Sequence, residues 1–176
     1  ASAVEGNIVQ TEGDTAVALA AMTASNTYAI ARLSCFRDEL ASAADVEGMG
    51  LKNTGGYIFY DGKYQRWLDP GKPAARKYLC DIAAEAAALG FDEILLTDVT
   101  YPTQGKLDKI AYGDAMKDEQ IKAFLTELRA ALADHEVRLS IELPAAVLTD
   151  GRDNVAGLLL ADIAPLVDCV YAPAAE

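Results

Sequence analysis

Acidic side chains stand where apolar segments of the sequence come to an end. Residues 91–99 (FDEILLTDV) carry Asp98 near their end, residues 137–143 (VRLSIEL) carry Glu142, and residues 27–36 (TYAIARLSCF) are followed by Asp38. Each segment has the length and composition of a buried strand. If the strands run parallel, their carboxyl ends meet at one rim, where carboxyl groups could give and take protons. Asp98 and Glu142 are therefore the first candidates for chemistry.

The direction of the Asp98 side chain depends on how its strand ends. Successive strand side chains point to opposite faces, so Glu93, Leu95 and Thr97 share one face and Asp98 starts on the other. Glu93 would be costly beneath apolar helices, so we expect its face to be the interior one. Asp98 then reaches the rim only if a bulge or the strand end turns it. Otherwise it caps the following loop by an Asx-type hydrogen bond.

Two further charges are expected on the interior face. Arg32 and Ser34 share a face of their strand, and Glu93 lies on the neighbouring strand. Burying Arg32 or Glu93 alone would be expensive. We predict that Arg32 and Glu93 form a structural ion pair within the barrel layer, with no catalytic role.

The elements that must position these residues alternate between strand and helix. Periodicity and capping signals predict strands at 27–36, 91–99, 137–143 and 167–172, helices at 73–90, 118–135 and 154–166, and a β-hairpin near 57–67 that turns at Asp61-Gly62. This alternation predicts an α/β fold with a parallel sheet and crossover helices, in one domain over residues 1–176.

The absence of a phosphate-binding glycine pattern favours a barrel over a nucleotide-binding open sheet. Neither GxGxxG nor GxxxxGK occurs. Polar strand ends are typical of (β/α)8 barrels, which need about 200–250 residues. With 176 residues and four or five defensible strands, we predict a TIM-barrel-like but incomplete barrel.

Composition excludes several partner classes. A net charge of −12 argues against nucleic acid and anionic membranes, and no apolar run is long enough to span a bilayer. The Ala-rich stretch 15–25 lacks a basic region before it, so it is expected to be a buried helix and not a signal peptide. His135 is the one histidine, and Cys35, Cys80 and Cys169 are far apart. We expect free thiols, no metal and no cofactor.

Three segments resemble a known family. YAIARLSCFRDEL, WLDPGKPAARKYLCDIAAEAAALGFDEI and VRLSIEL are similar to consecutive motifs of a bacterial family of predicted glycosyl hydrolase domains, TIM barrels distantly similar to α-amylase-type enzymes. The resemblance covers about residues 27–172. It implies a carbohydrate ligand and an extracellular or cell-envelope location. On this interpretation the chain holds the middle of a barrel, and GNIVQT (6–11) is the tail of an earlier strand.

The chain departs from the family at one strand end. The family pattern after GFDEI ends in Phe-Asp-Tyr-x-Arg-Phe-Pro, and here Thr97 stands at its Asp position and Thr100 at its Arg position. Glu142 matches an acidic position of the family. Glycoside hydrolysis uses two carboxyl groups around the scissile bond. We predict Glu142 as the acid, with Asp98 as the second carboxylate, each weighed against a purely structural hydrogen-bonding role.

Candidate sugar-binding residues lie near the same rim. Tyr64, Trp67 and Tyr101 could stack on the apolar faces of sugars, and Asp38 could line the mouth; alternatively, the hairpin aromatics only pack it against the barrel. The predicted function is acid-assisted hydrolysis of a polysaccharide. The alternative is a non-catalytic, glycan-binding or structural barrel remnant of an envelope protein. Open sheet edges predict a homo-oligomer.

Overall fold

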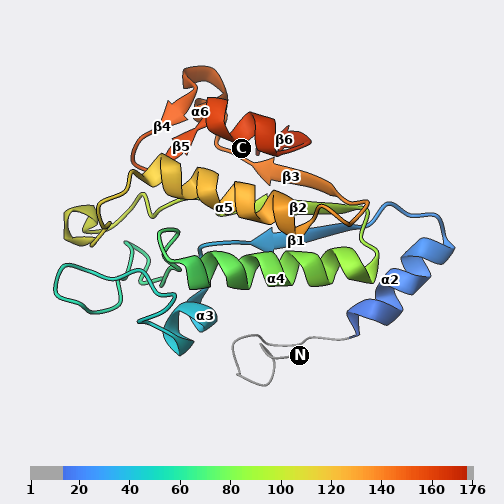
Figure 1. Cartoon of the computed structure of the whole chain (residues 1–176), viewed down its shortest axis with the longest axis horizontal. Helices are drawn as coiled ribbons and strands as arrows, with labels where there is room; N and C mark the ends of the chain where they lie inside the picture. The colour runs from blue at the N-terminus through green and yellow to red at the C-terminus, as the bar shows by residue number, and fades with distance from the viewer. Residues whose placement is uncertain (1–13, 174–176) are drawn as a thin grey trace.

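A parallel sheet of four strands forms the centre of the computed structural model, which describes residues 14–173 (Figure 1). The strands lie in the order β1 (Ile30–Ser34), β2 (Glu93–Thr97), β3 (Arg138–Glu142) and β6 (Cys169–Tyr171). Each neighbouring pair is parallel, and the register sets Ser34 beside Thr97 and Glu142 beside Tyr171. The carboxyl ends of all four strands therefore lie along one edge of the sheet.

Two long helices cover one face of this sheet. α4 (Pro73–Leu89) precedes β2 and α5 (Lys117–Ala131) precedes β3, and both lie on the same side of the strands (Figure 1). Proline at the first turn pre-sets the backbone of α4, and Gly90 ends it with φ of 98°, a conformation that costs glycine little. The helices and the alternate strand residues share one hydrophobic core, which includes Ile94, Leu96, Leu139 and Ile141.

The remaining elements are short or peripheral. They are α2 (Thr15–Ala24), α3 (Glu39–Ala44), η1 (Leu107–Lys109), α6 (Ala145–Asp150), β4 (Arg152–Asp153), β5 (Leu158–Leu159), α7 (Leu160–Ile163) and η2 (Ala164–Leu166). β4 and β5 pair antiparallel beside the main sheet.

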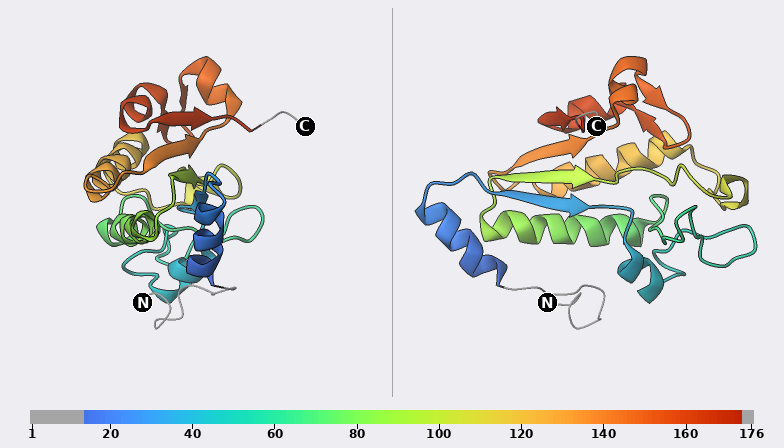
Figure 2. Two further views of the ribbon diagram at one scale, coloured as in Figure 1. Left: turned by 90° about the vertical axis from the view of Figure 1, so that its right-hand side faces the viewer. Right: turned by 180° about the vertical axis from the view of Figure 1, so that it is seen from behind.

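The second face of the sheet carries no helix within residues 14–173 (Figure 2, right). Ile30, Arg32 and Ser34 of β1 are exposed. In a closed eight-stranded barrel this face would line the interior. The fold is thus α/β and TIM-barrel-like with an incomplete barrel, as predicted, and β1 and β6 are its two edges.

The hairpin exists, but its turn is wider than the sequence predicted. Tyr60 pairs with Arg66 across a five-residue loop, 61–65, instead of a two-residue Asp61-Gly62 turn. The Asp61 carboxylate accepts hydrogen bonds from Lys63 N at 2.7 Å, Gln65 N at 3.0 Å and Trp67 Nε1 at 3.0 Å. Because these bonds need the longer loop, they outweigh the local preference of Asp-Gly for a tight turn.

The helix predicted over 154–166 is wrong in its first half. The Asp153 carboxylate accepts from Val155 N and Ala156 N, at 2.9 and 3.0 Å, and Gly157 has φ of 78°, so the chain turns back as the β4–β5 hairpin. Helical structure begins only at Leu160. α6, which follows Pro144 and ends at Gly151, was not predicted.

The Ala-rich stretch is helical as expected but is not buried. Asp14 caps α2 by accepting from Val17 N at 3.1 Å, and only Leu19 of the helix is buried. Alanine favours helix formation by itself, whereas burial needs neighbouring elements, and α2 projects from the end of the sheet (Figure 1). The strand tail predicted at residues 6–11 lies outside the described residues.

Candidate active site

At the end of β2, the backbone of Asp98 turns its side chain away from the face on which strand alternation would place it. Its φ is 54°, a left-handed conformation that few residues other than glycine adopt. The turned carboxylate accepts from Ser34 Oγ at 2.8 Å and from Arg37 Nη2 at 3.2 Å. Ser34 belongs to the uncovered face, so Asp98 reaches that side of the sheet. No backbone N–H of the following loop donates to it within the described chain, which disfavours the Asx-cap alternative.

Asp98 and Glu142 line the same cavity, which we call the carboxylate cavity. Its volume is about 360 Å³. Glu142 is half-buried at the end of β3. Within residues 14–173, no group donates a hydrogen bond to its carboxylate and no cationic side chain forms a salt bridge with it. One carboxyl group is therefore held by Ser34 and Arg37, while the other is open to a ligand. The structure brings together the two acids that the sequence singled out.

A third acid, Asp153, also lines the carboxylate cavity and was missed from the sequence. Its Oδ1 accepts from the backbone of the β4–β5 hairpin, which forms one wall. The signal was present as Asp-Asn followed by Gly157, a turn pattern, but this stretch was assigned to a helix. Asp153 shapes the wall by fixing the hairpin turn.

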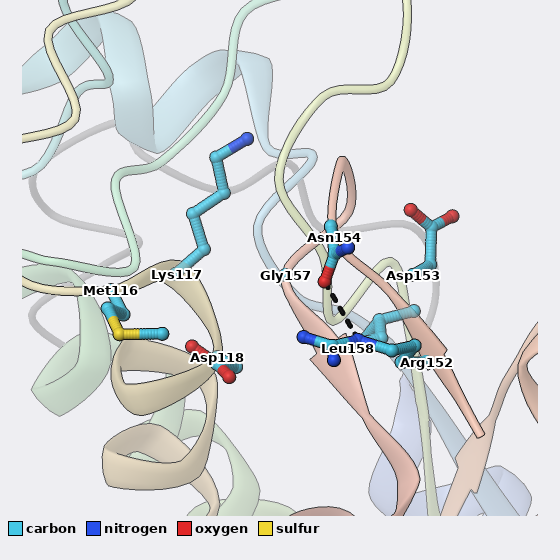
Figure 3. Close-up of a pocket in the computed structure, with 8 residues that line it drawn as sticks. All are labelled: Met116, Lys117, Asp118, Arg152, Asp153, Asn154, Gly157 and Leu158. Atoms are coloured by element: carbon cyan, nitrogen blue, oxygen red, sulfur yellow. Dashed lines mark hydrogen bonds between the residues drawn. The ribbon is translucent and has the colours of Figure 1, made fainter.

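The β4–β5 hairpin is anchored to the start of α5. A hollow of about 260 Å³ lies between the two elements. Among its lining residues, Figure 3 shows Met116, Lys117 and Asp118 on one side and the hairpin residues on the other. Arg152 Nε donates to Asn154 Oδ1 at 2.9 Å within the hairpin. Lys117 Nζ donates to Val155 O at 2.9 Å, and burial lowers the pKa of Lys117 while the charge of Asp153 opposes that shift. The hydrogen bond from Lys117 to Val155 joins the hairpin wall to the start of α5.

Asp38 does not line the mouth, contrary to prediction. Its Oδ1 caps α3 by accepting from Leu40 N at 3.0 Å and Ala41 N at 2.9 Å, and Tyr78 Oη donates to its Oδ2 at 3.1 Å. Burial, reinforced by the charge of Asp38, raises the pKa of Tyr78. Helix capping uses the carboxylate because α3 begins directly after it.

The three aromatic candidates have different environments. Trp67 is 7% exposed and Tyr101 is 1% exposed, so both are core residues. Tyr101 packs edge-on against Tyr112, with ring centroids 5.6 Å apart, and burial raises the pKa of Tyr101. Both reach a smaller hollow of about 190 Å³, the connecting cavity, which also contains Asp98. Tyr64 is 84% exposed and is the one of the three that offers a whole ring face to a ligand.

The predicted ion pair between Arg32 and Glu93 is absent from the described residues. The register sets Arg32 beside Leu95, and Glu93 beside Ile30 and Arg138. Tyr28 Oη donates to Glu93 Oε2 at 2.9 Å. Burial raises the pKa of Glu93, but the hydroxyls of Ser140, Tyr28 and Tyr171 and the charge of Arg138 outweigh it, so the pKa is lowered overall. The stagger between strands, which the sequence does not reveal, separates the two charges.

The three cysteines of the chain are free thiols in the structure. Cys35 and Cys80 are buried and Cys169 is half-buried, all as free thiols. Burial raises the pKa of Cys80 to about 11. Between residues 14 and 173, no three His, Cys, Asp or Glu side chains converge as metal ligands.

In the same range, no helix combines the length and apolar composition needed to cross a membrane.

This geometry can be compared with known proteins. A family model described as "Putative glycosyl hydrolase domain" matches residues 2–173. The chain belongs to this family. The resemblance noted in the three sequence motifs is thereby confirmed, and so is the glycoside-hydrolase-like nature of the fold. The comparison with curated proteins finds no match.

Solved structures show the same architecture. A hypothetical protein from Ruminiclostridium thermocellum is 29% identical with a TM-score of 0.70, covering 80% of this chain and 71% of that one. Ega3 from Aspergillus fumigatus, solved with galactosamine, matches with a TM-score of 0.56 at 10% identity. The glycoside hydrolase domain of PelA from Pseudomonas aeruginosa matches with a TM-score of 0.52 at 14% identity. Each covers 89% of this chain, which spans only 55% of either.

Thr97 and Thr100 stand where the family resemblance implied an aspartate and an arginine. Thr97 is buried, and Thr100 Oγ1 donates to Tyr101 O at 2.8 Å and Ala156 O at 3.2 Å, so neither offers a charge. An aspartate–arginine pair nevertheless stands at this strand end, because Asp98 and Arg37 are 3.2 Å apart.

Proposed function

We propose that this domain cleaves glycosidic bonds of a polysaccharide, with Glu142 as the proton donor and Asp98 as the second carboxylate. The observation that supports it is the left-handed backbone of Asp98, which brings its carboxylate to the cavity that Glu142 lines. The membership in a glycosyl hydrolase domain family is consistent with this assignment.

The two carboxyl groups suit different roles. Glycoside hydrolysis needs one group that protonates the leaving oxygen and one that attacks the anomeric carbon or activates water. Glu142, with an open carboxyl group, can meet the glycosidic oxygen directly. Asp98 is oriented by Ser34 and Arg37, which favours a fixed position beneath the sugar ring. Substrate binding would have to compete with the Arg37 contact, which is partly exposed.

The second candidate function is glycan binding without hydrolysis. One observation favours it: the family's aspartate position is occupied by Thr97, which is buried and neutral. In that case the same cavity would hold a sugar, and Glu142 would only accept hydrogen bonds from its hydroxyl groups.

Hydrolysis and binding assays on matched variants separate these functions. We expect Glu142→Gln to lower the release of reducing ends from a polysaccharide panel by about 100-fold or more, while binding on a glycan array is retained. Glu136→Gln, an exposed carboxyl at the opposite end of β3, is the control and should leave both unchanged. Equal binding by the wild type and Glu142→Gln with no hydrolysis by either would overturn the catalytic proposal in favour of binding alone.

A further inference from the structure

A larger cavity lies beside the hairpin loop and shares no lining residue with the carboxylate cavity. It has a volume of about 480 Å³ and lies between the 61–65 loop and residues 105–109. We call it the tyrosine–lysine cavity, because Tyr60, Tyr64, Lys106 and Lys109 are among its lining residues; Asn53, Ile58, Phe59, Asp61, Gly62 and Gly105 complete it. Nothing in the function proposed above uses it.

The loop presents Tyr64 in an exposed and strained conformation. Tyr64 has φ of 61°, which is unusual for an aromatic residue, and the residue is 84% exposed. The three hydrogen bonds to the Asp61 carboxylate and the bond from Tyr64 N to Asp61 O at 3.1 Å hold the loop in this form. A conformation maintained at such cost, with no packing gain for the ring, indicates a functional surface.

The charge of this cavity is opposite to that of the chain. Lys106 and Lys109 line it, and Asp61 is the only acid among its lining residues. Both Asp61 oxygens are already bonded within the loop. Asp108 pairs with Lys109 at 3.1 Å, yet the lysine side chain stays 61% exposed. In a chain of net charge −12, two accessible ammonium groups beside a free aromatic face favour a ligand that is both ring-shaped and anionic.

The hollows share walls and run toward the candidate active site. Asp61 lines both the tyrosine–lysine cavity and the connecting cavity. Asp98, Thr100 and Thr103 line both the connecting cavity and the carboxylate cavity. The shared lining residues therefore offer a chain of several sugar units a continuous path from Glu142 to Tyr64.

We propose that the tyrosine–lysine cavity binds a uronic acid unit, a pyranose that carries a carboxylate, of an acidic polysaccharide. The ring stacks on Tyr64, and Lys106 and Lys109 bind the carboxylate. The binding of the acidic sugar stands on this cavity alone, whereas the idea that the same polysaccharide is cut at Glu142 rests on the proposed function.

Binding of defined tetrasaccharides tests the site. By isothermal titration calorimetry, we expect tetragalacturonate to bind at least about fivefold more tightly than the neutral cellotetraose, with an advantage that shrinks as salt is raised. Tyr64→Ala should weaken tetragalacturonate binding about fivefold, and the double variant Lys106→Gln/Lys109→Gln about tenfold. Equal affinity for the neutral and acidic tetrasaccharides would overturn the proposal.

Matched controls distinguish the cavity from the general surface. Tyr57→Ala removes a neighbouring ring that is 75% exposed and does not line the cavity, and Lys77→Gln removes an exposed charge on α4. Neither should change the affinity, and a loss as large as that of Tyr64→Ala would refute the site. Glu142→Gln is expected to bind tetragalacturonate normally, so failure of hydrolysis and failure of this binding site give different results.

Discussion

Replacing Asp98 tests how much its side chain stabilises the left-handed backbone at the end of β2, measured as the free energy of unfolding. Alanine at this position loses the hydrogen bond from Ser34, worth about 1 kcal/mol. It also adopts a left-handed conformation without a side chain that favours it, which costs about 1 kcal/mol more. The Arg37 pair is partly exposed and contributes at most about 0.5 kcal/mol. We therefore expect Asp98→Ala to lower the free energy of unfolding by about 2 kcal/mol.

Asparagine is the informative comparison. Its amide oxygen can still accept from Ser34, and asparagine tolerates the left-handed region. Asp98→Asn should therefore lose less than about 1 kcal/mol. The assay is urea unfolding followed by circular dichroism, with Asp134→Ala, an exposed aspartate in the loop after α5, as the control. If Asp98→Ala and Asp98→Asn were equally stable, the left-handed backbone would not be a constraint, and the argument that it aims the carboxylate would fail.

Three more predictions concern the sheet and its supports. Burial raises the pKa of Glu93, but nearby hydroxyls and Arg138 bring it below the ordinary value of 4.5. The ionised Glu93 therefore contributes its full stability above pH 4.5 and loses it as the pH falls through the lower pKa of the folded state. Glu93→Gln should make the free energy of unfolding less dependent on pH in acid, and an unchanged pH profile would contradict this. Arg76 Nε donates to Glu127 Oε1 and Oε2 and its Nη1 to Pro70 O, so Arg76→Lys should cost about 1–2 kcal/mol in urea unfolding, and a loss within error would show that these bonds are replaced by water. Between residues 14 and 173, the outer edges of β1 and β6 pair with no further strand. We therefore expect self-association that rises with protein concentration in sedimentation velocity, and a monomer at every concentration would refute it.

The four strands of the main sheet, their parallel direction and the two long helices between them could be predicted from the sequence. Apolar runs of strand length, a proline-initiated helix that ends at Gly90 and a second amphipathic helix require a parallel sheet with crossovers, because each carries its own local signal. The same reasoning placed Glu142 at a strand end on the carboxyl rim, since strand alternation and parallel pairing suffice for that. These are properties of single segments and their neighbours along the chain.

Only the tertiary structure decided which polar groups face the site. Strand alternation starts Asp98 on the helix side and leaves open whether the strand end turns it to the rim; one backbone torsion does so. Asp38 was expected at the rim and instead caps α3. Glu93 and Arg32 share a face, but the stagger between strands keeps them apart. Hydrogen bonds to Asp61 widened the hairpin loop and exposed Tyr64. For Asp98 and Glu93, bonds to residues distant in sequence or the register between strands override the local preference. For Asp38 and Asp61, hydrogen bonds from residues two to six positions ahead compete with other local choices, and the folded chain decides between them.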